Sequence, residues 1–215
     1  MQMKHALKGN DIQKSVKCVA FSPDGSKLCV MDKSDDHNLA VYNTETGALI
    51  AKNKGDRSNI LELAWSSETQ FATVGPKHFK QWTIQNASIK SRMGNFGKNS
   101  QMIGSLAYHG QIALTGCKTG ELFQWSGSSL TKVVNKNHSD LIDAITVTSQ
   151  AIFTGGRDKK ICVLNPADYS LKSSLDTTVA FPGTMSGAVR AIAVDFNKNT
   201  LYAGTFGHEI YRIDF

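Results

Sequence analysis

The feature that most constrains this chain is a hairpin pattern that recurs along it. Its clearest copy covers residues 151–165 and reads AIFTGGRDKKICVLN: an apolar run, a Gly pair, a charged turn and a second apolar run. β-Branched and aromatic residues favour strands, whereas Gly and Asp favour turns, so this segment predicts a β-hairpin. Four more hairpins of the same layout are predicted at residues 27–43, 70–83, 111–126 and 200–214.

The spacing of the hairpins predicts the architecture. The last apolar residues of the five copies are Tyr42, Trp82, Trp125, Leu164 and Ile213, at intervals of 40, 43, 39 and 49 residues. A repeat of about 40–45 residues that consists of short strands is typical of a β-propeller. The sequence therefore predicts an all-β propeller of four-stranded blades, about five of them, in a single region that covers residues 1–215.

Turn residues around the hairpins give the blade boundaries. In the first blade, Ser22-Pro23-Asp24-Gly25 predicts a turn between two strands, because Pro pre-sets the backbone angle that such a turn needs. We predict blades at residues 16–52, 60–92, 102–134, 141–175 and 189–215.

The fifth predicted blade is one strand short. An open sheet edge leaves backbone groups unpaired, so residues 4–8 could supply the fourth strand and close a five-bladed ring. Alternatively, the chain is part of a larger propeller whose other blades lie elsewhere.

Several other classes of protein are disfavoured by the sequence. No apolar run approaches the ~18 residues needed to span a bilayer, so no membrane partner is expected. The four cysteines all fall in predicted strands without a CxxC pair, which is typical of reduced core residues in a cytoplasmic protein. The six histidines lack zinc-site spacing, and no nucleophile elbow or phosphate loop is present. We therefore expect no metal, no cofactor and no enzymatic activity.

The turns and aromatic strand ends resemble those of WD-repeat propellers. In such repeats a His, an Asp, a Ser or Thr and a Trp form a hydrogen-bonded network. The resemblance implies a structural network of His138, Thr154 and Asp158 in the fourth blade, where Leu164 stands in place of the Trp. The second and third blades have the Trp but no turn Asp, so the repeats are degenerate.

A narrower resemblance is carried by five segments. They read ATVGPKHFKQWT (72–83), GNFGK (94–98), LTGCKTGELFQWSGSSL (114–130), FTGGRDKKICVLN (153–165) and GAVRAIA (187–193). These segments resemble the echinoderm microtubule-associated protein-like (EML) family, in which two propellers lie in tandem, and their order resembles the later blades of the first propeller. The resemblance covers residues 16–215 and implies a cytoplasmic protein of the cytoskeleton with tubulin or microtubules as its partner.

The net charge also indicates an acidic partner. The formal charge is +6, and basic surfaces attract acidic proteins, anionic lipids and nucleic acids. In a propeller, the turns between second and third strands and the loops that join blades lie on one face. The residues that we tentatively assign to partner binding on this face are Lys54, Arg57, Lys77, His78, Lys118, Lys136, Arg157, Lys159 and Lys160.

Three kinds of partner remain open from the sequence. The first is tubulin or another cytoskeletal protein, as the family resemblance implies. The second is the assembly of a generic WD-repeat scaffold, in a ciliary or signalling complex. The third is nucleic acid, which is disfavoured because the basic residues lack interleaved aromatic side chains on which bases would stack.

Overall fold

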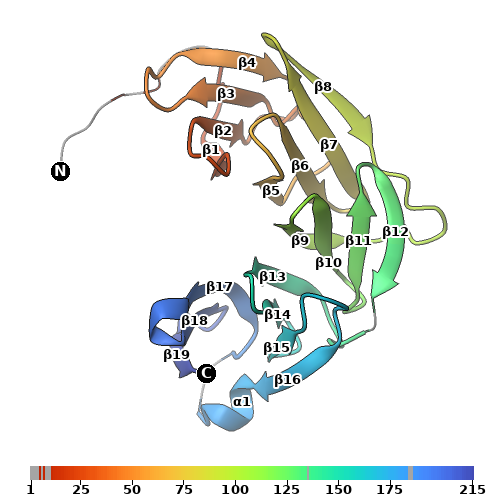
Figure 1. Ribbon diagram of the computed structural model, residues 1–215, viewed down its shortest axis with the longest axis vertical. Coiled ribbons are helices and arrows are strands. Elements are labelled where there is room, and N and C mark those ends of the chain that lie inside the picture. The colour runs from red at the N-terminus through yellow and green to blue at the C-terminus, as the bar shows by residue number, and fades with distance from the viewer. Residues whose placement is uncertain (1–4, 6, 8–10, 135, 184–185) are drawn as a thin grey trace. The chain divides into compact units, whose positions relative to one another are not determined.

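The protein is described by a computed structural model, which covers the chain except residues 1–4, 6, 8–10, 135 and 184–185. The described residues form five antiparallel sheets with very little helix (Figure 1). In each sheet, every strand pairs with the next strand along the chain. The prediction of an all-β fold built from four-stranded blades is therefore confirmed.

The chain divides into two compact units, residues 1–95 and 96–215, which are described separately. The first unit has two sheets, which we call blades one and two. Their strands are β1 (Val16–Phe21), β2 (Lys27–Asp32), β3 (Leu39–Asn43), β4 (Leu49–Asn53), β5 (Glu62–Trp65), β6 (Gln70–Gly75), β7 (His78–Gln85) and β8 (Ser88–Met93).

The second unit has three sheets, blades three to five. Their strands are β9 (Ile103–His109), β10 (Ile112–Cys117), β11 (Leu122–Ser126), β12 (Ser129–Val134), β13 (Ile142–Val147), β14 (Ile152–Gly156), β15 (Lys160–Leu164), β16 (Leu171–Asp176), β17 (Val189–Asp195), β18 (Thr200–Thr205) and β19 (Ile210–Asp214). A short helix α1 (Thr177–Ala180) and a 3₁₀ turn (Phe196–Lys198) interrupt the strands.

Blade five has three strands among the described residues. The segment expected to supply a fourth strand, residues 4–8, falls largely outside the described residues. Its two described members, His5 and Leu7, have irregular backbone. Ring closure by this segment, and the single region over residues 1–215, stay predictions.

The core of each unit is built on the second and third strands of the blades. Strands β6, β10 and β14 are almost wholly buried, whereas the outermost strands β8, β12 and β16 are mostly exposed. In the first unit, the rings of Phe71 and Trp82 stack 6.0 Å apart. In the second, Phe96 meets Trp125 edge-on at 4.9 Å. Large aromatic side chains thus fill the space between sheets and give each unit a rigid interior.

The first strand of most blades contains a β-bulge. In four of the five described sheets the pairing with the second strand passes over one residue near the start of the first strand. These bulged residues are Lys17, Gly104, Asp143 and Arg190. A bulge bends the strand and re-aims the side chain of the extra residue.

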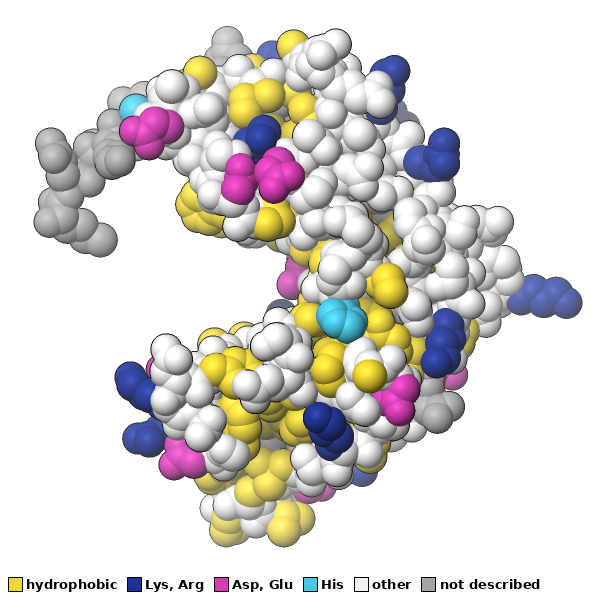
Figure 2. Space-filling view, in the orientation of Figure 1, with side chains coloured by type: hydrophobic (Ala, Val, Ile, Leu, Met, Phe, Trp, Pro, Cys, Tyr) yellow, Lys and Arg dark blue, Asp and Glu magenta, His cyan; other side chains and the backbone are white. Residues whose placement is uncertain are grey.

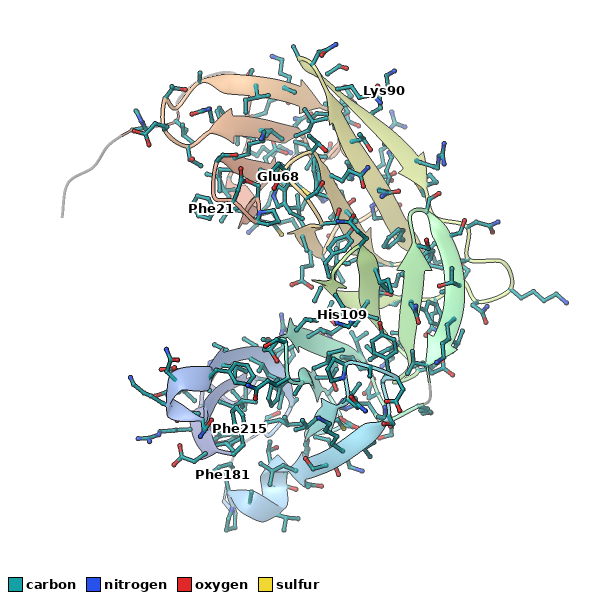
Figure 3. All side chains as sticks on the ribbon, viewed as in Figure 1. Phe21, Glu68, Lys90, His109, Phe181 and Phe215 are labelled. Carbon is teal, nitrogen blue, oxygen red and sulfur yellow. The ribbon has the colours of Figure 1, made fainter. Side chains whose placement is uncertain are left out.

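Each unit has a face, which we call its connection face, on which the second-to-third-strand turns and the links between blades lie together. It comprises residues 33–38, 54–61 and 76–77 in the first unit, and residues 97–102, 118–121, 136–141, 157–159, 177–188 and 206–209 in the second, undescribed residues excepted. The opposite ends of the strands carry the remaining turns. Of the residues labelled in Figure 3, Glu68 lies in one of these turns and His109 is the last residue of β9. Apolar side chains are visible among polar ones on the side of each unit that Figure 2 shows.

Candidate functional site

In blade four, the structure brings together the three residues of the expected network. The Nε2 atom of His138 lies 2.8 Å from Oγ1 of Thr154, and its Nδ1 atom lies 2.8 Å from Oδ1 of Asp158. A carboxylate only accepts hydrogen bonds, so Nδ1 carries a proton and donates it to Asp158. All three side chains are buried. The network therefore ties the link before β13 to the turn after β14.

The charge on Asp158 is held by its hydrogen bonds. Burial alone would raise the pKa of this carboxyl, but the bonds from His138 and from the backbone N–H of Ser139, at 2.9 Å, bring the pKa below its usual range. Gly156 provides the space for this arrangement. A Cβ atom there would lie 2.5 Å from Oδ1 of Asp158 and 2.6 Å from Nδ1 of His138. The second Gly of the Gly pair is thus required by the network.

Blade two contains a related network that the sequence analysis missed. The indole N–H of Trp82 donates to Oγ1 of Thr73 at 2.9 Å, and this hydroxyl lies 2.9 Å from Nε2 of His78. Nδ1 of His78 lies 3.7 Å from Oδ2 of Asp56. Here the His follows the turn between second and third strands and the Asp precedes the first strand. The chain positions of acid and base are therefore the reverse of those in blade four.

His78 was expected on the exposed, partner-binding surface, but the structure places it in the interior. Its side chain is fully buried, because its ring fills the space beside Thr73 that His138 fills beside Thr154 in blade four. Burial lowers the pKa of His78 to about 4, so the imidazole is neutral at physiological pH. His78 therefore belongs to the structural network rather than to the surface.

The turns of blades one and three are held by other side chains. In blade one, Asp32 accepts from the backbone N–H groups of Gln13, Ser34 and Asn38 at 2.9–3.0 Å. Although burial opposes it, hydrogen bonds from the Ser34 hydroxyl, from the backbone N–H groups of Gln13 and Ser34 and from the Asn38 side chain lower the pKa of Asp32 to about 2. In blade three, Gln101 accepts from the backbone N–H and the hydroxyl of Thr119. Each turn on the connection face is therefore fixed by buried or local polar groups.

The other predicted binding residues lie on the connection faces, with Lys160 just inside the start of β15. Lys54 and Arg57 both approach Asp36, at 2.7 and 3.6 Å, and Lys118 contacts Asp140. The remaining ones are Lys77 in the first unit and Lys136, Arg157, Lys159 and Lys160 in the second. Exposed ion pairs contribute little to stability, so a partner can replace these intrachain carboxylates at small cost.

One pair of residues that the sequence analysis did not select stands out on this face. Phe206, in the turn between β18 and β19, is 46% exposed, and the guanidinium of Arg190 lies 4.3 Å from its ring centroid. Arg190 was not selected from the sequence because it lies at the start of the predicted fifth blade, where a bulge leaves no mark in the apolar pattern. Phe206 could have been selected from the sequence, because an aromatic residue in a predicted turn is expected to be exposed.

Chemistry-bearing side chains elsewhere in the described residues are dispersed. No three His, Cys, Asp or Glu side chains of this part of the chain are grouped in a way that could hold a metal ion. All four cysteines are free thiols, and burial raises the pKa of Cys162 to about 11. None of the helices described in the structure has the length and apolar character needed to cross a membrane.

Comparison with known proteins places this architecture in a family. The family model described as "Echinoderm microtubule-associated protein first beta-propeller" matches residues 1–213. Among curated proteins, the chain is 28% identical over 219 residues to human "Echinoderm microtubule-associated protein-like 2", covering 97% of this chain and 33% of that protein. It is 26% identical over 211 residues to "Ciliary WD repeat-containing protein ctxp80" of Euplotoides octocarinatus, covering 94% of this chain and 28% of that protein.

A solved structure supports the fold. The computationally designed Ika8 protein is similar to this chain with a TM-score of 0.72 and 19% identity, covering 94% of this chain and 59% of that one. The chain spans about a third of the length of the curated relatives named above. The sequence-based assignment to a WD-repeat propeller of the EML type is confirmed, and the chain belongs to the family of the first β-propeller of echinoderm microtubule-associated proteins.

Proposed function

We propose that this chain is a non-enzymatic, protein-interaction module of a microtubule-associated protein in the cytoplasm, and that it binds tubulin or another cytoskeletal partner through a connection face. The observation that carries the proposal is the contrast between two sets of polar groups. The networks of blades two and four are buried and bonded within the chain, whereas lysine and arginine side chains project from the same turns. A rigid frame that presents cations at its surface suits an acidic protein partner.

The same contrast argues against catalysis. The two histidines of these networks, His78 and His138, are both buried and bonded to a threonine. A general base must reach its substrate, and neither ring is open to solvent. The relatives support a scaffold role in the same way, since their names describe microtubule-associated and WD-repeat proteins.

Co-sedimentation with polymerised tubulin tests the proposal. The full chain is compared with a triple charge reversal on the connection face of the second unit, Arg157→Glu, Lys159→Glu and Lys160→Glu. The matched control reverses three cations on outer strands of the same unit: Lys132→Glu, Lys172→Glu and Arg212→Glu. We expect the face variant to lose pelleting and the control, with the same net charge, to keep it. Equal loss in both variants would show that only net charge matters.

A generic WD-repeat scaffold in a ciliary or signalling complex is the second candidate, and one relative carries a ciliary name. Absence of binding to both polymerised and soluble tubulin by the folded chain would favour this candidate. Tighter binding of an unrelated RNA than of tubulin would favour a nucleic-acid site. The two affinities must be measured at the same salt concentration, because phosphate contacts are strongly salt-dependent.

A further inference from the structure

We propose that Arg190, Phe206 and Arg157 form a recognition site for a carboxylate side chain in an acidic peptide segment of the protein partner. The inference rests on the proposed function, since it locates the contact on the second unit and states its chemistry. All three residues belong to the second unit and lie at the connection-face ends of blades four and five.

The site is built around an exposed ring. Phe206 is 46% exposed, the Arg190 guanidinium carbon lies 4.3 Å from the ring centroid, and that of Arg157 lies 5.7 Å from it. Aromatic residues and arginine are enriched at protein interfaces, and arginine is among the residues that most often contribute large binding energies there. The ring also restricts the two guanidinium groups, so less side-chain freedom is lost when a ligand binds.

Two charged residues of the site and its surroundings are the bulged residues of first strands. Asp143, the bulged residue of β13, accepts from Arg157 at 2.7 Å (Nε to Oδ2) and 3.4 Å (Nη2 to Oδ1). Arg190 is the bulged residue of β17. Within the described residues, no carboxylate is within ion-pair distance of the Arg190 guanidinium. The Asp143–Arg157 pair is nearly neutral, and the Arg190 guanidinium brings a positive charge that is in no ion pair among the described residues.

The acidic residue of the β18–β19 turn, Glu209, forms hydrogen bonds within its own hairpin. Glu209 accepts from the Tyr211 hydroxyl at 2.5 Å and from the Thr205 hydroxyl at 3.2 Å. It therefore holds the turn that carries Phe206. A carboxylate of the partner can therefore pair with the Arg190 guanidinium.

The stacking of Arg190 on Phe206 favours a carboxylate over a nucleic-acid base. The guanidinium occupies a face of the ring, where a base would otherwise stack. A stacked guanidinium keeps its N–H groups in its own plane, where they form paired hydrogen bonds with a planar carboxylate. Glutamate-rich segments of a protein offer such groups in series.

The test measures binding of a fluorescein-labelled octaglutamate peptide to the full chain by fluorescence anisotropy, with a labelled eight-residue oligothymidylate as a second probe. The variants are Arg190→Gln, Arg190→Lys and Phe206→Ala. The matched control is Arg212→Gln, which removes the same charge from an exposed arginine of the same blade that is paired with Asp214. Thermal unfolding of each variant checks that it is folded.

We expect Arg190→Gln to weaken peptide binding about tenfold and Phe206→Ala about fivefold, with Arg212→Gln within about twofold of the unchanged chain. Arg190→Lys keeps the charge but loses the planar group, so a loss clearly larger than that of the control is expected. Equal effects of Arg190→Gln and Arg212→Gln would overturn the site. An absence of peptide binding by the folded chain would also overturn the site. The same holds if Arg190→Gln weakened oligothymidylate binding more than peptide binding.

Parallel measurements with tubulin separate this inference from the proposed function. If tubulin binds equally to the unchanged chain and to Arg190→Gln, the site is wrong and the proposed function stands. If the peptide binds in an Arg190-dependent manner but tubulin does not bind, the site stands and a different acidic protein is the partner.

Discussion

Nδ1 of His78 lies 3.7 Å from Oδ2 of Asp56, and this pair reverses the chain positions that His138 and Asp158 hold in blade four. In both blades the imidazole Nε2 meets a threonine hydroxyl of the second strand, at 2.9 and 2.8 Å. Both blades therefore bring a threonine, an imidazole and a carboxylate together, but at 3.7 Å the His78–Asp56 contact is not a hydrogen bond, and Nδ1 of His78 is buried without a hydrogen-bond partner among the described residues. The imidazole and the carboxylate can therefore come from either the turn or the link, because both segments border the same space beside the threonine.

Removal of the His138 imidazole should be strongly destabilising. His138→Ala leaves the buried Asp158 carboxylate and the Thr154 hydroxyl without their shared partner, and we expect the free energy of unfolding to fall by about 2–4 kcal/mol. His208→Ala, at an exposed turn position, should change it by less than about 0.5 kcal/mol. Urea unfolding measures the free energy of unfolding of both variants. A similar decrease in the two would contradict the stabilising role of the network.

The Thr73 hydroxyl should link Trp82 to His78 in blade two. Thr73→Val keeps the shape but removes this group, and both the Trp82 indole N–H and the His78 imidazole lose a partner. We expect a loss of about 1–3 kcal/mol in unfolding free energy, and Thr73→Ser should recover most of it. If valine and serine were equally tolerated, packing rather than hydrogen bonding would explain the threonine.

The stability of the first unit should depend on pH through His78. Its pKa is lowered from 6.5 to about 4 by burial, so between these values the unfolded chain binds a proton that the folded chain does not. Stability should therefore fall as pH decreases from about 6.5 to 4. Asp158 and Asp32 also have lowered pKa values, so the stabilisation that their carboxylates give the folded protein is lost as pH falls through their folded-state pKa values. The His78→Gln variant keeps this contribution and is therefore the reference for the contribution of His78. Identical slopes of stability against pH in the two proteins would contradict the burial of a neutral His78.

The Gly pair of blade four should tolerate substitution poorly at its second position. Gly156→Ala brings a Cβ atom within 2.6 Å of two network atoms, so we expect a loss of at least about 2 kcal/mol. Gly204→Ala is the control, because the nearest atom to its added Cβ is 3.9 Å away. It should be within about 1 kcal/mol of the unchanged protein. Thermal unfolding of the two variants makes the comparison, and a harmless Gly156→Ala would mean that the network has room to move.

Sequence reasoning was most successful where periodicity and turn chemistry decide the structure. The hairpin at residues 151–165 and its repeats predicted the strands, because short apolar runs rich in β-branched and aromatic residues, separated by Gly or Asp turns, report directly on local backbone. The placement of His138, Thr154 and Asp158 followed from a family pattern with the ordinary order of residues. His78 was misplaced because its partner, Asp56, comes from the opposite position in the repeat, and only the folded blade brings the two together.

The contact between Arg190 and Phe206 could not be predicted from the sequence. A β-bulge shifts the register of one strand by one residue, and the apolar pattern around Arg190 reads the same with or without it. The contact between Arg190 and Phe206 joins a first strand to a turn more than ten residues away. Long-range contacts of this kind depend on packing between elements, which local propensity does not encode.

The affinity of the purified chain for soluble tubulin dimer is the most direct measure of the central claim. It should be determined for the unchanged chain, for the triple reversal of Arg157, Lys159 and Lys160 to Glu, and for the matched reversal of Lys132, Lys172 and Arg212. The account predicts that the unchanged chain and the matched control bind and that the connection-face variant does not. Binding by all three proteins, or failure of the folded, unchanged chain to bind, would contradict it.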